Sequence, residues 1–117
     1  MIMIEKIVYD FLTEKMSVPV YMEVPQNPPT RMVIVEKTGS SLDEYIYTST
    51  FAIQSYGKSL LDAAELNDML VTAMLDGVNG LVSLDKILRV DLNSDYNFTD
   101  TTTKKYRYQA IIIVTHY

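Results

Sequence analysis

Two segments of the chain repeat their apolar residues with the period of an α-helix, and they constrain the fold more than any other feature. In the first segment, apolar residues recur at i, i+3, i+4, i+7 and i+8, as Ile4, Ile7, Val8, Phe11 and Leu12. This spacing predicts an amphipathic helix with one buried stripe. Pro19 limits the helix at its C-terminal end, because the residue before a proline avoids the α region.

The second helical segment has a wider apolar arc and its own end signals. The arc consists of Leu60, Ala63, Ala64, Leu66, Leu70, Val71 and Met74. Ser59 is placed to cap the N-terminus of this helix, with Asp62 three residues later as its capping-box partner. Gly77 is suited to the C-terminal cap, and Asn79-Gly80 indicates a turn after it.

The remaining apolar segments have the alternation or the β-branched composition of strands. Five strands are expected, over residues 18–23, 31–38, 45–56, 84–96 and 104–116. Pro25, Pro28 and Pro29 make the stretch after the first strand an extended loop, because proline donates no ladder hydrogen bond. Residues 39–43 have turn chemistry, so the strands on either side of them are expected to form a hairpin.

The last two strands are expected to pair as a hairpin with a defined register. Leu88, Val90 and Leu92 share one face of the first strand. One face of the second strand carries Tyr106, Tyr108, Ala110, Ile112 and Val114. A register with Asp95 opposite Lys105 puts both apolar sets on the core side and pairs opposite charges outside. The connecting residues 97–103 are polar and rich in threonine, and we expect them to be mobile.

The length of the chain, 117 residues, fits one domain that spans residues 1–117 in the order αβββαββ. Hydrophobic residues make up 48% of the chain and charged residues 21%, which is typical of a packed globule and excludes a mostly disordered chain. The sequence therefore predicts an α+β fold, with two amphipathic helices packed on a mainly antiparallel sheet of about five strands.

Composition excludes several classes of function. The chain has no cysteine, so disulfides, thiolate metal sites and a thiol nucleophile are impossible. The N-terminal segment lacks the order of a signal peptide, and no apolar run approaches the ~20 residues that cross a bilayer, so we expect a cytosolic protein without membrane contact. A net charge of −5 disfavours specific nucleic-acid binding. The local basic cluster of Lys104, Lys105 and Arg107 is interpreted as a solvated strand face.

Two stretches are similar to ligand-binding loops but lack essential residues. Gly57-Lys58-Ser59 has the end of a phosphate-binding loop, yet Ala52 stands where that motif needs its first glycine. The five residues Asp91-Leu92-Asn93-Ser94-Asp95 begin like a calcium loop. Tyr96 and Thr102 then replace its turn glycine and its bidentate glutamate. We interpret the first as a loop ending in a helix cap and the second as an exposed strand face.

The titratable side chains form no catalytic constellation in the sequence. Asp62, Glu65 and Asp68 share one side of the second helix, which we interpret as a solvated face. His116 is the one histidine and lies next to the C-terminus, where chain ends are usually mobile, so no catalytic role is expected for it. Asn97-Phe98-Thr99 fits a glycosylation acceptor by chance, since no secretion signal accompanies it. No catalytic, cofactor-binding or metal-binding residue is assigned.

The chain contains nine tyrosines, more than we expect for its length. Four of them, Tyr45, Tyr47, Tyr106 and Tyr108, lie in expected strands, where aromatic side chains pack well. We interpret them as core and cross-strand packing, with protein–protein contact as the alternative, because tyrosine is enriched at interfaces. Met69, on the polar side of the second helix, is a similar candidate for such a contact.

The order of these segments resembles that of the tail terminator, or tail completion, proteins of long-tailed bacteriophages and prophages. The features of the resemblance span most of the chain. They are the helix ending near Val18-Pro19-Val20-Tyr21, the proline-rich loop, the strand Met32-Val33-Ile34-Val35-Glu36, the long strand through residues 50–56, the helix from Ser59, and the last two strands over residues 87–96 and 106–114.

The resemblance implies a virion assembly protein and not an enzyme. Such a protein would form a ring, typically a hexamer, that caps the finished tail tube and contacts the head connector, with no cofactor. Its partners would be further copies of itself, the tail tube protein and the connector protein, and the free chain could exist as a monomer before assembly. It would be found in the bacterial host cytoplasm during assembly and then in the virion tail.

Loops and exposed strand faces are the expected contact surfaces of such a protein. Residues 24–30, 39–44 and 97–103 would supply the assembly contacts. Two other functions stay open at this point. One is a head–tail connector or head-completion component, which has a similar size and element pattern. The other is a small ligand-binding module or an enzyme, which would need an apolar pocket with convergent polar groups.

Overall fold

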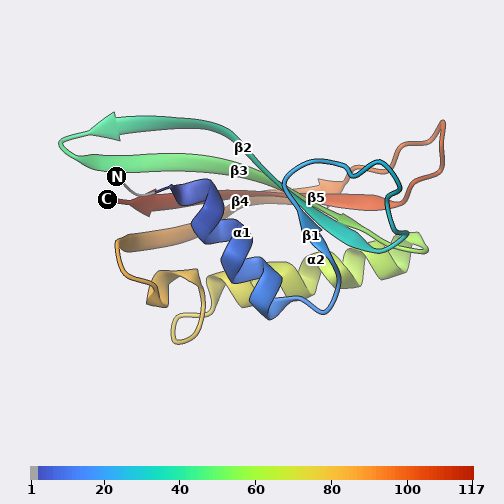
Figure 1. Ribbon diagram of the computed structural model, residues 1–117, viewed down its shortest axis with the longest axis horizontal. Coiled ribbons are helices and arrows are strands. Elements are labelled where there is room, and N and C mark those ends of the chain that lie inside the picture. The colour runs from blue at the N-terminus through green and yellow to red at the C-terminus, as the bar shows by residue number, and fades with distance from the viewer. Residues whose placement is uncertain (1–2) are drawn as a thin grey trace.

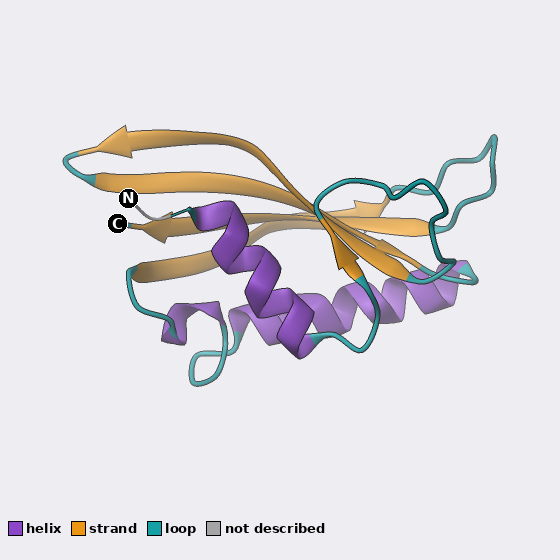
Figure 2. Ribbon diagram, in the orientation of Figure 1, coloured by secondary structure: helices purple, strands orange, loops and turns teal. Residues whose placement is uncertain are grey.

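Two helices lie on one face of a five-stranded sheet (Figures 1 and 2). The computed structural model describes residues 3–117. Its elements are α1 (Ile4–Lys15), β1 (Val20–Tyr21), β2 (Met32–Asp43), β3 (Ile46–Tyr56), α2 (Leu60–Leu75), the 3-10 helix η1 (Leu81–Ser83), β4 (Ile87–Asn97) and β5 (Arg107–His116). The strands are ordered β1-β2-β3-β5-β4, and every neighbouring pair is antiparallel except β1 with β2. The expected α+β class and the expected element order are therefore confirmed.

One hydrophobic core fills the space between the helices and the sheet. Val8, Leu12, Leu66 and Leu70 pack from the two helices and have no exposed surface. The sheet contributes every second residue of its central strands, namely Val33, Val35, Phe51, Ile53, Ala110, Ile112 and Val114. Burying each large apolar side chain contributes about 1.5–3 kcal/mol, so this layer supplies most of the stability. The two apolar stripes predicted from helical spacing face this core, except that Leu60 at the start of α2 is 41% exposed.

The opposite face of the sheet is not covered by a helix (Figure 2). A small second cluster of Met32, Ile34 and Tyr56, with Tyr21 packed against it, forms at one end of this face. Next to the cluster, the Gln54 amide donates to Gln109 at 2.7 Å, and the Gln109 amide donates to the Tyr96 hydroxyl at 2.5 Å. A polar ladder therefore crosses three strands of the open face.

The turn expected at residues 39–43 is wrong, because β2 continues through this stretch to Asp43. Gly39 pairs with Thr50 and Asp43 with Ile46, after a bulge between Lys37 and Gly39. The hairpin turns instead at Glu44 and Tyr45, which have positive φ angles of 47° and 71°. Two successive residues with positive φ are the signature of a type I′ turn, which joins strands without splaying them. Backbone pairing across the hairpin outweighs the low strand propensity of the Gly-Ser-Ser stretch.

The expected register of β4 and β5 holds only in part. Val90 opposite Val114 and Leu92 opposite Ile112 keep the expected parity. A bulge between Leu92 and Ser94 then shifts the register, so that Asp95 pairs with Ala110 and not with Lys105. The pairing of opposite charges is therefore wrong, because one extra residue turns every later side chain to the other face. A second bulge, next to Ile87, leaves Leu88 exposed, although it was expected in the core.

Several element ends differ from those expected. β1 is shorter than residues 18–23, β4 begins only at Ile87 after the unpredicted helix η1, and β5 begins at Arg107. Gly77 is not an αL cap, since no glycine in residues 3–117 has a positive φ. α2 ends instead with the Asp76 carboxylate accepting from the backbone N–H groups of Val78 and Asn79. Gly80 is the glycine this turn needs, because a Cβ there would collide with the Asp76 carbonyl.

No helix in residues 3–117 has the length and apolar character that crossing a bilayer requires.

Asn67, on the core side of α2, gives a test of the shifted register. Its side chain is 3% exposed and donates from Nδ2 to Asp95 Oδ2 at 2.9 Å, while its own Oδ1 has no partner. Asn67→Asp would set two carboxylates against each other, so the free energy of unfolding should fall by about 1–3 kcal/mol at neutral pH. The loss should shrink in acid, where one carboxyl takes a proton. Urea unfolding at two pH values measures this.

The control for that experiment is Asn67→Leu, which removes the unpaired carbonyl together with the donor to Asp95. Asp95 is exposed, so water can solvate its carboxylate and stability should change little. Equal stability of Asn67→Asp and the wild type at neutral pH would show that residue 95 does not face α2.

The hairpin turn provides a second test of the fold. A side chain in the left-handed region costs about 1–2 kcal/mol, and glycine avoids most of that cost. Changing Glu44 to Asn and Tyr45 to Gly restores the preferred type I′ pair, so the free energy of unfolding should rise by about 1 kcal/mol. Thermal unfolding of dilute protein measures the change. A lower unfolding temperature would mean that the Tyr45 side chain stabilises the isolated chain.

Candidate functional site

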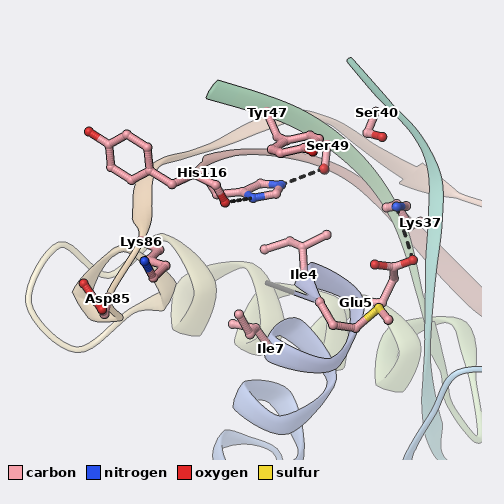
Figure 3. Close-up of a pocket in the computed structure, with 12 residues that line it drawn as sticks. Ile4, Glu5, Ile7, Lys37, Ser40, Tyr47, Ser49, Asp85, Lys86 and His116 are labelled. Atoms are coloured by element: carbon pink, nitrogen blue, oxygen red, sulfur yellow. Dashed lines mark hydrogen bonds and ion pairs between the residues drawn. The ribbon is translucent and has the colours of Figure 1, made fainter. Parts of the chain in front are cut away.

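A cavity lies between the start of α1, the outer half of the β2–β3 hairpin and the end of β5 (Figure 3). It has a volume of about 770 Å³. Met3, Ile4 and Ile7 form an apolar floor on α1, and Tyr47 and His116 form an aromatic wall on the sheet. Polar side chains lie around the opening, namely Glu5, Lys37, Ser40, Asp85 and Lys86.

His116 is fixed in this wall, contrary to the expectation of a mobile chain end. Its side chain is 2% exposed, and its ring stacks on that of Tyr47, with centroids 5.3 Å apart and 8° between planes. Its Nδ1 lies 3.0 Å from the main-chain oxygen of Tyr117, and its Nε2 lies 2.8 Å from Ser49 Oγ. A main-chain oxygen only accepts, so Nδ1 carries the proton and Nε2 accepts from the serine hydroxyl.

The Ser49–His116 pair has two parts of a catalytic triad but lacks the rest. The third position is occupied by a main-chain oxygen of Tyr117 and not by the side-chain carboxylate of an aspartate or glutamate. Ser49 has no exposed surface and lies within the paired part of β3, whereas a nucleophile must reach a substrate. The hydrogen bond therefore satisfies two polar groups that the fold buries.

An ion pair closes one side of the cavity. Lys37 Nζ on β2 lies 3.2 Å from Glu5 Oε2 on α1, and both side chains are 27% exposed. A hydrogen bond from its own backbone N–H, with a further contribution from Lys37, holds the pKa of Glu5 below its ordinary value of 4.5 against the opposing effect of burial. This pair connects the first turn of the helix to the sheet.

The stretches that are similar to ligand loops have structural roles. Gly57 packs tightly against the backbone of Asp62 and Ala63, so a Cβ there would collide. Ser59 Oγ accepts from the backbone N–H of Asp62 at 3.1 Å, which confirms the expected cap. The Asp62 carboxylate accepts from Lys58 N at 2.8 Å and from Arg31 Nε at 3.0 Å, and these hydrogen bonds lower its pKa.

The other candidate carboxylates are not brought together. Glu65 and Asp68 lie exposed on α2, as expected. Arg89 pairs with Asp91 at 2.7 Å on the open face, whereas Asp95 turns to Asn67. No three His, Asp or Glu side chains within residues 3–117 gather as metal ligands would.

The loop after β4 is tied down at its base, although its sequence suggested mobility. Arg107 Nε donates to the Phe98 carbonyl at 2.7 Å, and the guanidinium lies 4.4 Å from the centre of the Phe98 ring. Arg107 also donates to the Tyr56 hydroxyl at 2.9 Å. Asp100 and Lys105 form an isolated bridge further out. Arg107 is therefore a structural residue, while Lys104 and Lys105 are exposed.

The tyrosines divide between the two roles proposed for them. Tyr47 and Tyr108 are half-buried in strands, as packing requires. Tyr45, in contrast, is 88% exposed at the hairpin turn and has no role in the core. Met69 is 51% exposed on α2. The cavity residues Glu5, Lys37 and Ser49 were missed from the sequence, because only the tertiary fold brings their three elements together.

The sequence matches no protein-family model and no curated protein.

The Glu5–Lys37 pair predicts a pH dependence of stability. A carboxyl whose pKa is lowered by folding stabilises the fold above its ordinary pKa and loses this contribution as the pH falls through the lowered value. Glu5→Gln should therefore be less stable than the wild type above pH 4.5, with a difference that vanishes in stronger acid. Chemical unfolding at a series of pH values measures it.

Glu14→Gln is the matched control, since Glu14 lies exposed on the same helix. A difference between Glu5→Gln and the wild type that stays constant down to the lowest pH would contradict the ionic role of Glu5.

Proposed function

We propose that this chain is a structural assembly protein of a long-tailed bacteriophage or prophage. It caps the tail tube as an oligomeric ring and joins the tube to the head connector, without catalysing a reaction. The element order that resembles tail terminator proteins supports the proposal, and so does one surface feature that a monomer does not need.

That feature is the outer end of the β2–β3 hairpin. The pairing of β3 with β5 begins at Tyr47, so residues 42–46 extend past the rest of the sheet (Figure 1). Leu42 is 56% exposed and Tyr45 is 88% exposed on this projection. An isolated two-stranded hairpin is marginally stable in water, and exposed apolar side chains do not help it. A contact with another protein would explain both the projecting hairpin and the exposed apolar side chains on it.

Electron microscopy of tail tubes tests the proposal. The chain is produced together with the tail tube protein encoded in the same genome. Tubes of uniform length with a ring at one end are the expected result. Tubes of unchanged length together with a monomeric chain would contradict the proposal, and a ring found only at the head portal would favour a connector component.

Two leucine variants make this experiment specific to the hairpin. Leu42→Ser should reduce the fraction of capped tubes at least several-fold, because it removes apolar contact area from the projection. Leu61→Ser is the matched control, since Leu61 is 68% exposed on α2. Equal loss of capping in both variants would point to a general effect on folding.

The cavity beside His116 favours a second function, that of a small ligand-binding module. Its 770 Å³ lies within the range of about 300–1,000 Å³ typical of small-molecule sites, and it combines an apolar floor with polar groups. Thermal unfolding against a panel of metabolite-sized acids and amines tests this function. A ligand that stabilises the wild type but not Lys37→Met would support it, whereas no shift with any compound would count against it.

A further inference from the structure

The outer end of the hairpin is called the arm here and consists of residues 42–46. All of its side chains are exposed except that of Ile46, which is half-buried. Its turn places Tyr45 at φ 71°, a left-handed conformation that is a genuine outlier for a bulky residue. Strained backbone conformations of this kind are concentrated at functional sites of proteins. The arm therefore presents an aromatic ring at its tip.

A small hollow lies on the molecule far from the arm. It is formed by Pro28 and Pro29 of the loop before β2, by Tyr56 at the end of β3, and by Lys105 and Tyr106 before β5. Its volume is about 190 Å³, well below the 300 Å³ or more of a site for a small organic ligand. Prolines and tyrosines make it suitable for a single aromatic side chain, because rings pack on such surfaces.

The arm and the hollow lie toward opposite ends of the molecule. Figure 1 shows the hairpin turn at one end of the long axis and the start of β5 toward the other, and the molecule is 44 Å long in this direction. The arm of one copy therefore cannot fill its own hollow. It can reach the hollow of another copy that lies end to end with the first.

The arm and the hollow are complementary in charge as well as in shape. Asp43 and Glu44 directly precede Tyr45 on the arm, whereas Lys105 lines the hollow and Lys58 follows Gly57 at its edge. None of these four charged side chains forms an ion pair within residues 3–117. Two arms brought together would repel each other, while an arm and a hollow attract.

We propose that the arm of one copy docks in the hollow of a second copy, with the Tyr45 ring between Pro28, Pro29 and Tyr106. Asp43 and Glu44 then approach Lys105 and Lys58. The inference rests on the proposed self-assembly and specifies its contact. Because the two surfaces differ, the contact is heterologous, and repeating it gives a closed ring or an open filament instead of a two-fold dimer.

The absence of cysteine makes disulfide trapping a clean test of this contact. One batch of protein carries Asp43→Cys and a second, longer tagged batch carries Pro28→Cys, so that Tyr45 is retained in both. When the batches are mixed and oxidised, a disulfide of mixed mass should dominate. Links between two Asp43→Cys chains would instead show an arm-to-arm contact and overturn the proposal, as would the lack of any link in concentrated protein.

Thr72→Cys is the matched control, because Thr72 lies exposed on α2, outside both surfaces. Mixed with Asp43→Cys, it should give at most a small fraction of the disulfide that Pro28→Cys gives. Equal yields from the two mixtures would mean that the links form by random collision, and this result would also overturn the proposal.

Sedimentation of the reduced protein over a range of concentrations tests the energetics. Tyr45→Ala should weaken self-association at least about tenfold, as truncation of a central interface tyrosine does. Tyr117→Ala is the control, since Tyr117 is 51% exposed, follows the last residue of β5 and belongs to neither surface. Glu44→Lys and Lys105→Glu should each weaken association, and mixing the two variants should restore it between unlike copies. Failure of this rescue, or a monomeric wild type at every concentration, would contradict the docking.

The outcomes separate this inference from the proposed function. Capped tubes without mixed disulfides would refute the arm-and-hollow contact while leaving the tail-cap function in place. Mixed disulfides without tube capping would establish the contact and remove the tail-cap function.

Discussion

The pairing of β3 with β5 is the interaction on which the rest of the structure depends. It runs from Tyr47 opposite His116 to Tyr56 opposite Arg107 and joins two parts of the chain that are far apart in sequence. The helix side of these two strands is completely buried at Phe51, Ile53 and Ile112. Bringing two distant strands together costs loop-closure entropy, and this cost is offset only when the apolar face of the strands is covered. The sheet and α2 are therefore expected to form together.

The same pairing positions the features outside the core. It ends at Tyr47, and the hairpin beyond that point is left as a projection. It also brings the end of β5 under the hairpin, where the Ser49–His116 hydrogen bond satisfies two polar groups that would otherwise be buried without partners. At the opposite end, the start of β5 lies beside the proline-rich loop and helps to form the small hollow. One strand pair thus sets the positions of the arm, the cavity and the hollow.

The sequence is a reliable guide to this fold wherever periodicity is regular. The helical spacing around Phe11 and Leu66 correctly identifies both helices and, apart from Leu60, their buried sides. Ser59 correctly marks the start of α2. It is a poor guide at irregular positions. The bulge before Ser94 reverses the side to which Asp95 points, and nothing in the composition of the strand signals it. The true hairpin turn was missed because Glu44 and Tyr45 are not the residues that a type I′ turn prefers.

The candidate sites are less predictable than the fold for the same physical reason. Glu5, Lys37 and His116 belong to three elements, and their proximity follows from packing that no local pattern encodes. The sequence did indicate that tyrosines and loops would supply contacts. Tyr45 is the most exposed large hydrophobic residue among the described residues. Exposure, and not residue type alone, separates a contact residue from a core residue.

Amide hydrogen exchange of dilute and concentrated protein tests the central claim most directly, namely that the chain assembles through its two ends and not through its core. The account predicts that raising the concentration slows exchange in residues 40–46, 24–30 and 104–107, while α2 and the middle of β3 exchange at unchanged rates. Slower exchange confined to the residues around His116, or no change in any segment, would contradict it.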